Sequence, residues 1–148
     1  MGRTIVVANQ KGGVGKTTTS INLSASLASL GKNVLVIDMD PQGNTTSGLG
    51  VEKDEVENTV YELLLGEKTI QECLQPEIFE NLSILPSNVN LAGAEIELVG
   101  VEGKEYLLKN ALDEIKGDYD FVIIDCPPSL NTLTINSMCA GDTVLVPI

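Results

Sequence analysis

Short apolar runs alternate along this chain with longer segments whose apolar positions recur at helical spacing. The apolar runs predict β-strands at residues 3–8, 33–37, 82–85, 121–124 and 143–148. The periodic segments predict helices at residues 16–30, 59–66, 69–76, 91–98, 103–115 and 129–138. Strands that alternate with helices are typical of a mainly parallel sheet with helices on both faces. The pattern therefore predicts an α/β fold.

Capping residues and a glycine-rich polar segment predict where several of these helices and strands begin or end. The helices after Thr59 and Thr69 each begin with a Thr-x-x-Glu capping box, completed by Glu62 and Glu72. Residues 39–50 are polar and rich in glycine, and they predict a loop.

The last run, residues 143–148, is apolar at positions that face both sides of a strand. Such a run is typical of an internal strand in a helix-covered parallel sheet. A covering helix normally follows a strand of this type, so we expect residues 1–148 to be a single domain that is truncated at its C-terminus. A chain of 148 residues is long enough to bury one core.

A glycine-rich turn joins the first strand to the first helix. Successive N–H groups of such a turn can point at an anion, and the helix adds its N-terminal donors and the positive end of its dipole. Lys16 is suited to reach the β- and γ-phosphates of a nucleoside triphosphate, and the Thr17 hydroxyl to bind the accompanying Mg²⁺. The predicted phosphate-binding residues are Lys11, Gly12, Gly13, Val14, Gly15, Lys16, Thr17 and Thr18.

Three interpretations of this turn compete. The general P-loop pattern requires a glycine where this chain has Gln10. A dinucleotide fingerprint that starts at Gly13 and Gly15 would need its third glycine at Thr18. A plain flexible turn would leave Lys16 and the threonines after it without a role. The strand before the turn and the helix after it favour the nucleotide-phosphate site.

Lys11 has no role in the general P-loop scheme, but the sequence Lys-Gly-Gly-Val-Gly-Lys-Thr-Thr that it opens resembles the deviant Walker A motif of the ParA/MinD superfamily. These proteins are P-loop ATPases. The resemblance implies that Lys11 reaches across a nucleotide-sandwich dimer to the ATP of the partner subunit, where its charge offsets the charge of the transferred phosphoryl group. It makes Lys11 and Lys16 candidate catalytic residues. The alternative for Lys11 is a solvated lysine in a loop.

A second motif is the apolar strand 121–124 that ends at Asp125, which is a Walker B arrangement. A buried strand holds such a carboxylate opposite the phosphate loop, where it can bind Mg²⁺ through a water together with Thr17. Many strands end in aspartate, so the motif gains its weight from the loop at Lys11–Thr18.

A third motif, Asp38–Asn44, resembles the switch I region of ParA/Soj partition ATPases. The resemblance implies that Asp38 belongs to the Mg²⁺ shell and that Asp40 orients the attacking water. A carboxylate suits the second role because it accepts a hydrogen bond from water. The alternative is that this segment forms only a turn, which is compatible with catalysis.

The choice of branch within the superfamily depends on details. The segments Asp40–Asn44, Pro86–Asn88, Leu91–Glu95 and Asp125–Leu130 resemble the chromosomal ParA/Soj branch. Proteins of MinD type usually continue differently after the second aspartate and anchor through a C-terminal amphipathic helix that this chain lacks. The nitrogenase iron protein needs cluster cysteines that the cysteines of this chain do not obviously match.

The resemblance also makes Pro127, Pro128 and Ser129 a candidate switch II, which senses the γ-phosphate and passes its state to the dimer face. The alternative is a plain connection between strand and helix.

The amino-acid composition excludes some kinds of functional site. The formal net charge is -12 and the chain has no histidine, which excludes an imidazole metal site and a histidine base and argues against a broad basic nucleic-acid surface. The acidic residues concentrate at 52–80, which is typical of a solvated face. The three cysteines lack a paired spacing and predict reduced thiols. With no signal peptide or membrane-spanning run, we expect a soluble, cytoplasmic protein.

The resemblance implies a slow ATPase with ATP and Mg²⁺ as cofactors, which dimerises on ATP binding and drives chromosome or plasmid partition. The implied partners are a ParB/Spo0J-type centromere-binding protein and nonspecific DNA, bound mainly by the missing C-terminal part, so that the ATP dimer associates with the nucleoid and not with a membrane. One alternative is a MinD-like membrane-associated regulator of cell division or positioning. Another is a fragment that binds nucleotide without turning it over, because adenine contacts and part of the dimer face would be missing.

Overall fold

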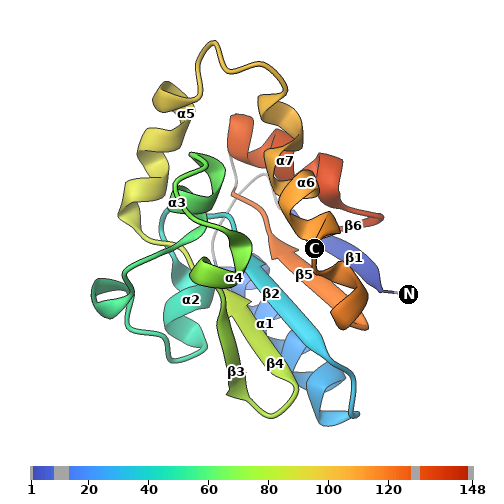
Figure 1. The fold of residues 1–148 in the computed structure, drawn as a ribbon. Helices are drawn as coiled ribbons and strands as arrows, with labels where there is room; N and C mark the ends of the chain where they lie inside the picture. The colour runs from blue at the N-terminus through green and yellow to red at the C-terminus, as the bar shows by residue number, and fades with distance from the viewer. Residues whose placement is uncertain (1, 9–13, 128–130, 147–148) are drawn as a thin grey trace.

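The computed structural model describes residues 2–8, 14–127 and 131–146, and within them six strands form one sheet (Figure 1). The strand order is β3-β4-β2-β5-β1-β6, and every neighbouring pair is parallel except β3 with β4. The strands are β1 (Arg3–Val7), β2 (Val34–Asp38), β3 (Gln75–Phe79), β4 (Leu82–Leu85), β5 (Phe121–Asp125) and β6 (Thr143–Leu145). The predicted mainly parallel sheet is confirmed.

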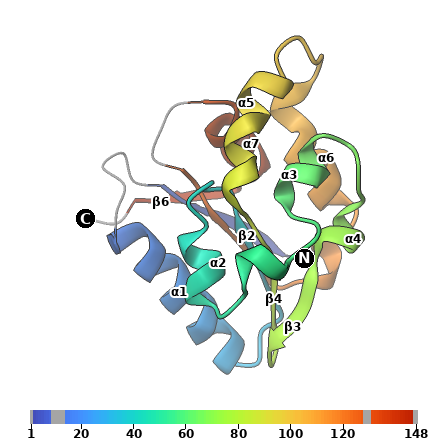
Figure 2. The ribbon, with the colours of Figure 1, turned by 90° about the vertical axis from the view of Figure 1, so that its left-hand side faces the viewer.

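Helices lie on both faces of this sheet (Figure 2). The α-helices are α1 (Val14–Ser29), α2 (Asn44–Gly48), α3 (Val60–Leu64), α4 (Ile70–Cys73), α5 (Ala94–Glu97), α6 (Leu107–Asp113) and α7 (Thr132–Ala140). Four 3₁₀ turns among the described residues are η1 (Lys53–Glu55), η2 (Val89–Gly93), η3 (Lys104–Tyr106) and η4 (Lys116–Asp118). None of the described helices is long and apolar enough to cross a membrane.

The core has two halves because successive side chains of a strand point to opposite faces. Val34 and Val36 of β2 pack with Ala28 of α1 on one face. Leu35 and Ile37 pack on the other face, in the larger cluster that includes residues of α3, α4, α5, α6 and α7. All five residues of β2 are buried, so this strand runs through the middle of the molecule.

Two predictions about local structure were wrong. Residues 39–50 are not only a loop, because they contain the short helix α2. The stretch after Cys73 forms β3, an antiparallel edge strand, where Pro76 is tolerated because an edge position does not require its missing N–H. The predicted last strand is present as β6, and it is exposed along its length because within the described residues it pairs with β1 alone.

The cysteines agree with their prediction. Cys73, Cys126 and Cys139 form no disulfide with one another, and the first two are buried. Burial raises the pKa of the Cys73 thiol to about 11, so this thiol stays protonated at neutral pH.

Both predicted capping boxes are present, and they differ in burial. Thr59 accepts a hydrogen bond from the Tyr61 N–H at 3.2 Å and is fully buried, whereas the equivalent Thr69 accepts from the Glu72 N–H at 3.2 Å and is exposed. We predict that Thr59→Ala lowers the free energy of unfolding by about 1–2 kcal/mol and Thr69→Ala by about 0.5–1 kcal/mol. Urea denaturation measures both. Equal losses would contradict a contribution from the burial of Thr59.

Candidate active site

Two carboxylates lie at the carboxyl ends of neighbouring parallel strands. Asp38 ends β2 and Asp125 ends β5, and the two residues are partners in the register of these strands. Both are fully buried. Val7, the last residue of β1, is in register with Asp125 on its other side. This edge of an open α/β sheet is where such folds bind their ligands.

Asp38 is held by three hydrogen bonds from the chain. Its Oδ1 accepts from the Asp40 N–H at 3.0 Å, while its Oδ2 accepts from the Thr46 N–H at 2.9 Å and the Thr46 hydroxyl at 2.7 Å. Burial, followed by the negative charge of Asp125, raises the pKa of Asp38 to about 7, against the opposing effect of these hydrogen bonds. The hydrogen bonds therefore orient the carboxylate without neutralising its charge.

Helix α2 brings hydroxyl groups to both carboxylates. The Thr45 hydroxyl donates to Asp125 Oδ2 at 2.6 Å, and the neighbouring Thr46 donates to Asp38. The side chains of Thr45 and Thr46 are fully buried. One short helix thus connects the ends of two central strands.

The loop between β2 and α2 is a tight turn that carries Asp40. Asp40 Oδ1 accepts from the Gln42 N–H at 3.0 Å, and the Asp40 carbonyl accepts from the Gly43 N–H at 2.9 Å. Gly43 has a φ of 63°, a left-handed conformation that favours glycine. Asp40 is 6 % exposed. The turn that the sequence predicted is therefore present, and it lies directly beside Asp38.

Two side chains from elsewhere hold this turn. The Ser87 hydroxyl donates to the Asp40 carbonyl at 2.7 Å, and the Lys53 ammonium donates to the Gln42 carbonyl at 2.8 Å. Ser87 follows β4 and is fully buried, whereas the Lys53 contact is exposed to solvent.

The predicted phosphate loop is described only in part. Lys11, Gly12 and Gly13 lie outside the described residues, as do the side chains of residues 14–16, including Lys16. The described part begins α1 at Val14, and Thr17 and Thr18 lie in the first turns of this helix.

For the predicted switch II, Pro127 is described and Pro128 and Ser129 lie outside the described residues. The structure therefore brings together Asp38, Asp40 and Asp125, which the sequence predicted as the metal shell and the water-orienting group.

Three residues that bond to the predicted site were not singled out from the sequence, namely Thr45, Thr46 and Ser87. The Thr45 and Thr46 hydroxyls donate to the carboxylates of Asp125 and Asp38, and the Ser87 hydroxyl donates to the Asp40 carbonyl, through contacts that span 80, 8 and 47 positions of the chain. The available signal was the pair of threonines directly after the aspartate-bearing turn. Ser87 had a weaker signal, as a hydroxyl residue placed just after a strand.

The chemistry of the site suits a small divalent cation. Mg²⁺ prefers oxygen ligands and is commonly held by one or two carboxylates together with phosphates and waters. Asp38 and Asp125 supply such carboxylates. Among the described residues, no group of three or more His, Cys, Asp or Glu side chains could hold a metal ion, so the remaining ligands would come from a hydroxyl, water or a bound anion.

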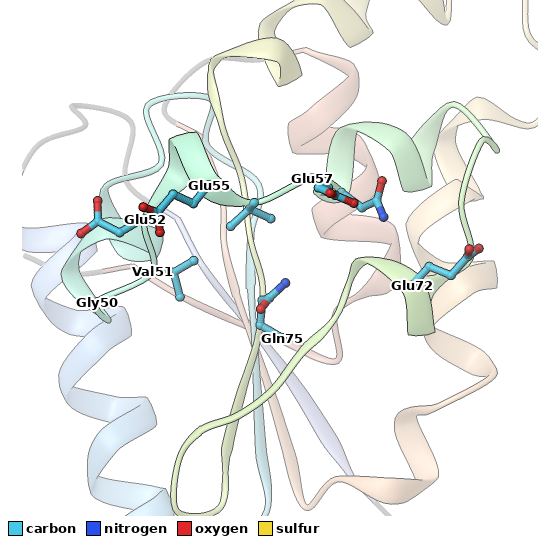
Figure 3. Close-up of a pocket in the computed structure, with 9 residues that line it drawn as sticks. Gly50, Val51, Glu52, Glu55, Glu57, Glu72 and Gln75 are labelled. Carbon is cyan, nitrogen blue, oxygen red and sulfur yellow. The ribbon is translucent and has the colours of Figure 1, made fainter.

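A separate pocket lies away from these carboxylates, between the segment around η1 and the start of β3 (Figure 3). Its volume is about 580 Å³. Its acidic lining residues are Glu52, Glu55, Glu57 and Glu72. These residues fall within the acidic stretch of the sequence, and they would repel phosphate groups. The pocket is thus unsuited to the phosphates of a nucleotide.

The raised pKa of Asp38 predicts a pH-dependent stability in the absence of ligand. Between the ordinary value of 3.8 and about 7, the folded state binds more protons than the unfolded state. The contribution of Asp38 to the free energy of unfolding is therefore fully present below pH 3.8, and it is lost as the pH rises through about 7. We predict that the stability of Asp38→Asn relative to wild type rises by up to about 4 kcal/mol from pH 4 to pH 8.

Urea denaturation across this pH range measures the difference. Any fixed cost of the asparagine, whose amide cannot match all three donors, does not vary with pH and so does not affect the slope. Asp54→Asn, which removes an exposed carboxylate, serves as the control for the loss of one negative charge. A wild-type to Asp38→Asn difference that stays constant with pH would contradict the prediction.

Comparison with known proteins shows the family of this chain. Residues 2–148 match the model of a family described as AAA domain (AAA_31). The chain is 53% identical over 148 residues to the sporulation initiation inhibitor protein Soj of Bacillus subtilis, and 51% identical over 148 residues to the chromosome partitioning protein ParA of Myxococcus xanthus. These alignments cover 100% of this chain, and 58% of Soj and 52% of ParA. The chain therefore spans little more than half the length of these relatives.

A solved structure shares the fold. It is described as cobyrinic acid a,c-diamide synthase from Mycobacterium smegmatis with a bound ATP analog and magnesium. Its TM-score is 0.94 at 46% sequence identity, over 100% of this chain and 60% of that one. The family match and the partition proteins confirm the resemblance that the motifs indicated. The chain thus belongs to the AAA-domain family that includes the ParA and Soj chromosome-partitioning proteins.

Proposed function

We propose that this chain is the nucleotide-binding part of a partition ATPase, with residues 1–148 forming a single ParA-type ATPase domain. The ATPase cleaves the β–γ phosphoanhydride of ATP slowly. The observation that carries the proposal is the pair of buried carboxylates, Asp38 and Asp125, in register at the carboxyl edge of the sheet. Relatives named as partition proteins, at 51% and 53% identity, support the biological role.

Residues Lys11 to Thr18 would bind the phosphates of ATP, with Lys16 on the β- and γ-phosphates. Thr17, Asp38 and Asp125 would hold Mg²⁺, and the donor set fits this ion because all its atoms are oxygens. Asp38 already accepts three hydrogen bonds, which suits a contact through water. When bound, Mg²⁺ offsets the charge of the phosphates.

Asp40 would orient the attacking water. Its position two residues after Asp38, in a turn anchored on β4 through Ser87, supports this role because a water-orienting group must be held rigidly. Lys11 would complete the site of a second subunit in an ATP-dependent sandwich dimer, where a cation stabilises the charge that develops on the transferred phosphoryl group.

The partners proposed for the whole protein follow from its relatives. The ATP dimer binds DNA nonspecifically, and a ParB/Spo0J-type protein stimulates hydrolysis. The formal charge of -12 on this chain opposes a DNA surface here, so the proposed DNA contacts lie mainly on the part of the relatives' length that this chain does not span.

The likeness to a cobyrinic acid a,c-diamide synthase supports the nucleotide site more than it supports amide synthesis. That structure is described with an ATP analog and magnesium, which are the ligands that the carboxylates suit. Its identity to this chain, 46%, is lower than the 53% of Soj. A fold of this kind carries many functions, so the role is argued from the site and the nearer relatives.

The test of hydrolysis is the Asp40→Ala variant. We predict that it binds ATP normally but lowers the single-turnover rate of hydrolysis by about a hundredfold or more, because the attacking water loses its acceptor. Lys16→Ala should instead abolish tight ATP binding. Asp54→Ala removes an exposed carboxylate of the following segment and should leave the rate unchanged. An unchanged rate in Asp40→Ala would show that another group orients the water.

The test of the dimer is the Lys11→Ala variant. We predict that it retains nucleotide binding and loses ATP-dependent dimerisation, because the cation that crosses to the other subunit is missing. Size-exclusion chromatography with and without ATP and Mg²⁺ measures this. Lys32→Ala, which removes an exposed lysine beyond the other end of α1, is the matched control. Normal dimers in Lys11→Ala would exclude the proposed role.

A further inference from the structure

Buried hydrogen bonds connect the segment after β4 to the Asp38 carboxylate and to the backbone carbonyl of Asp40. The Ser87 hydroxyl donates to the Asp40 carbonyl at 2.7 Å, and the Ser87 N–H donates to the Thr46 hydroxyl at 3.0 Å. Thr46 in turn donates to Asp38 Oδ2 at 2.7 Å. Ser87 and Thr46 are fully buried. A single residue outside the phosphate loop, the Walker B strand and the switch I segment is therefore bonded to the Asp40 turn and, through Thr46, to Asp38.

We propose that Ser87 is a positioning residue for ATP hydrolysis, which sets the direction of the Asp40 carboxylate by holding the Asp40 carbonyl. This inference rests on the proposed ATPase function and gives a role to Ser87, whose segment Pro86–Asn88 resembles the ParA/Soj branch but received no role from that resemblance. Ser87 touches neither nucleotide nor metal in this role. It acts through Asp40.

The other hydrogen bonds of the turn explain why Ser87 matters. The bonds from Gln42 and Gly43 to Asp40 are local, so they fix the shape of the turn but not its orientation relative to the sheet. The bond from Lys53 to the Gln42 carbonyl reaches the turn from an exposed, long side chain. The bond from Ser87 is buried and comes from a distant part of the chain. Together with the Asp40 N–H bond to Asp38 Oδ1, it therefore holds the turn against the sheet, and among the hydrogen bonds described here it is the buried one that reaches the turn from beyond β2 and α2.

The backbone segment that carries Ser87 is held in place by the sheet. It follows Leu85, which lies in register with Ile37 on the neighbouring strand β2, one residue before Asp38. The strand that presents Asp38 and the segment that presents Ser87 are thus paired by the sheet. Functional side chains supported in this way keep their geometry, and misplacement of a reacting group by about 1 Å can cost a hundredfold in rate.

Ser83 provides a matched control on the same segment. It lies in β4, four positions before Ser87, and it is 6 % exposed. Its hydroxyl accepts a hydrogen bond from the Glu77 N–H at 3.0 Å, on the edge strand β3. Ser83→Ala therefore removes a buried hydroxyl that has no bond to the carboxylates.

The experiment compares Ser87→Ala with Ser83→Ala in the full chain, by steady-state and single-turnover hydrolysis of ATP with Mg²⁺. We expect Ser87→Ala to lower kcat about tenfold to a hundredfold while KM and the affinity for ATP change less than about twofold. Ser83→Ala should leave kcat unchanged. A loss of ATP affinity with kcat intact in Ser87→Ala, or an equal fall of kcat in Ser83→Ala, would overturn the proposal.

A double-mutant cycle with Asp40→Ala separates positioning from general loss of structure. If Ser87 acts through Asp40, Ser87→Ala lowers the rate of wild type but not the residual rate of Asp40→Ala. A structural defect would lower both rates by the same factor, and that result would overturn the proposal. Should Ser87→Ala fail to fold, Ser87→Cys takes its place, because a thiol fills the site with a weaker donor and is expected to lower kcat in the same direction.

Different results would overturn the proposed ATPase function and the proposed role of Ser87. Absence of ATP hydrolysis by the whole protein of which this chain is the nucleotide-binding part would overturn the proposed ATPase, and the role of Ser87 with it. Normal hydrolysis by wild type and by Ser87→Ala alike would overturn the role of Ser87 alone.

Discussion

The arrangement of this site depends on two carboxylates that the sheet buries side by side. Asp38 and Asp125 are in register on neighbouring strands, and neither is exposed. Removing such groups from water costs several kcal/mol for each charge. The surrounding residues reduce that cost. The hydroxyls of Thr45 and Thr46 donate hydrogen bonds to Asp125 and Asp38, and the raised pKa of Asp38 lowers the fraction of this group that is charged.

The sequence predicted the two carboxylates but not the groups that hold them. Asp38 and Asp125 each end a short apolar run, and parallel strands present such ends at one edge. The hydroxyl of Ser87 reaches Asp40 across 47 positions, and no local pattern encodes such a contact. The helix at Thr45 and Thr46 was missed because four polar residues and a glycine match a loop as well as a helix. The capping boxes at Thr59 and Thr69 were predicted because their signal lies within four residues.

The edges of the sheet were harder to predict than its centre for a related reason. An apolar run predicts a strand, but which strands lie beside it depends on the whole topology. Strand β2 has neighbours on both sides and is fully buried. Strand β6 has a similar apolar sequence, yet it lies at an edge of the described sheet with its side chains exposed. Pattern alone could not separate these two cases.

Neutral hydroxyls at the carboxylates are also the choice that best fits a site for a cation. A lysine or arginine bonded to Asp38 would stabilise the buried charge more strongly, but it would then compete with Mg²⁺ for the same oxygens. A threonine hydroxyl donates one hydrogen bond and leaves the negative charge in place. Among the described residues, the causes that shift the pKa of Asp38 are burial, the charge of Asp125 and hydrogen bonds, and they leave a carboxylate that a bound divalent cation would convert fully to its charged form. Stability in the absence of the ion is thus lowered at the same residues that would bind it.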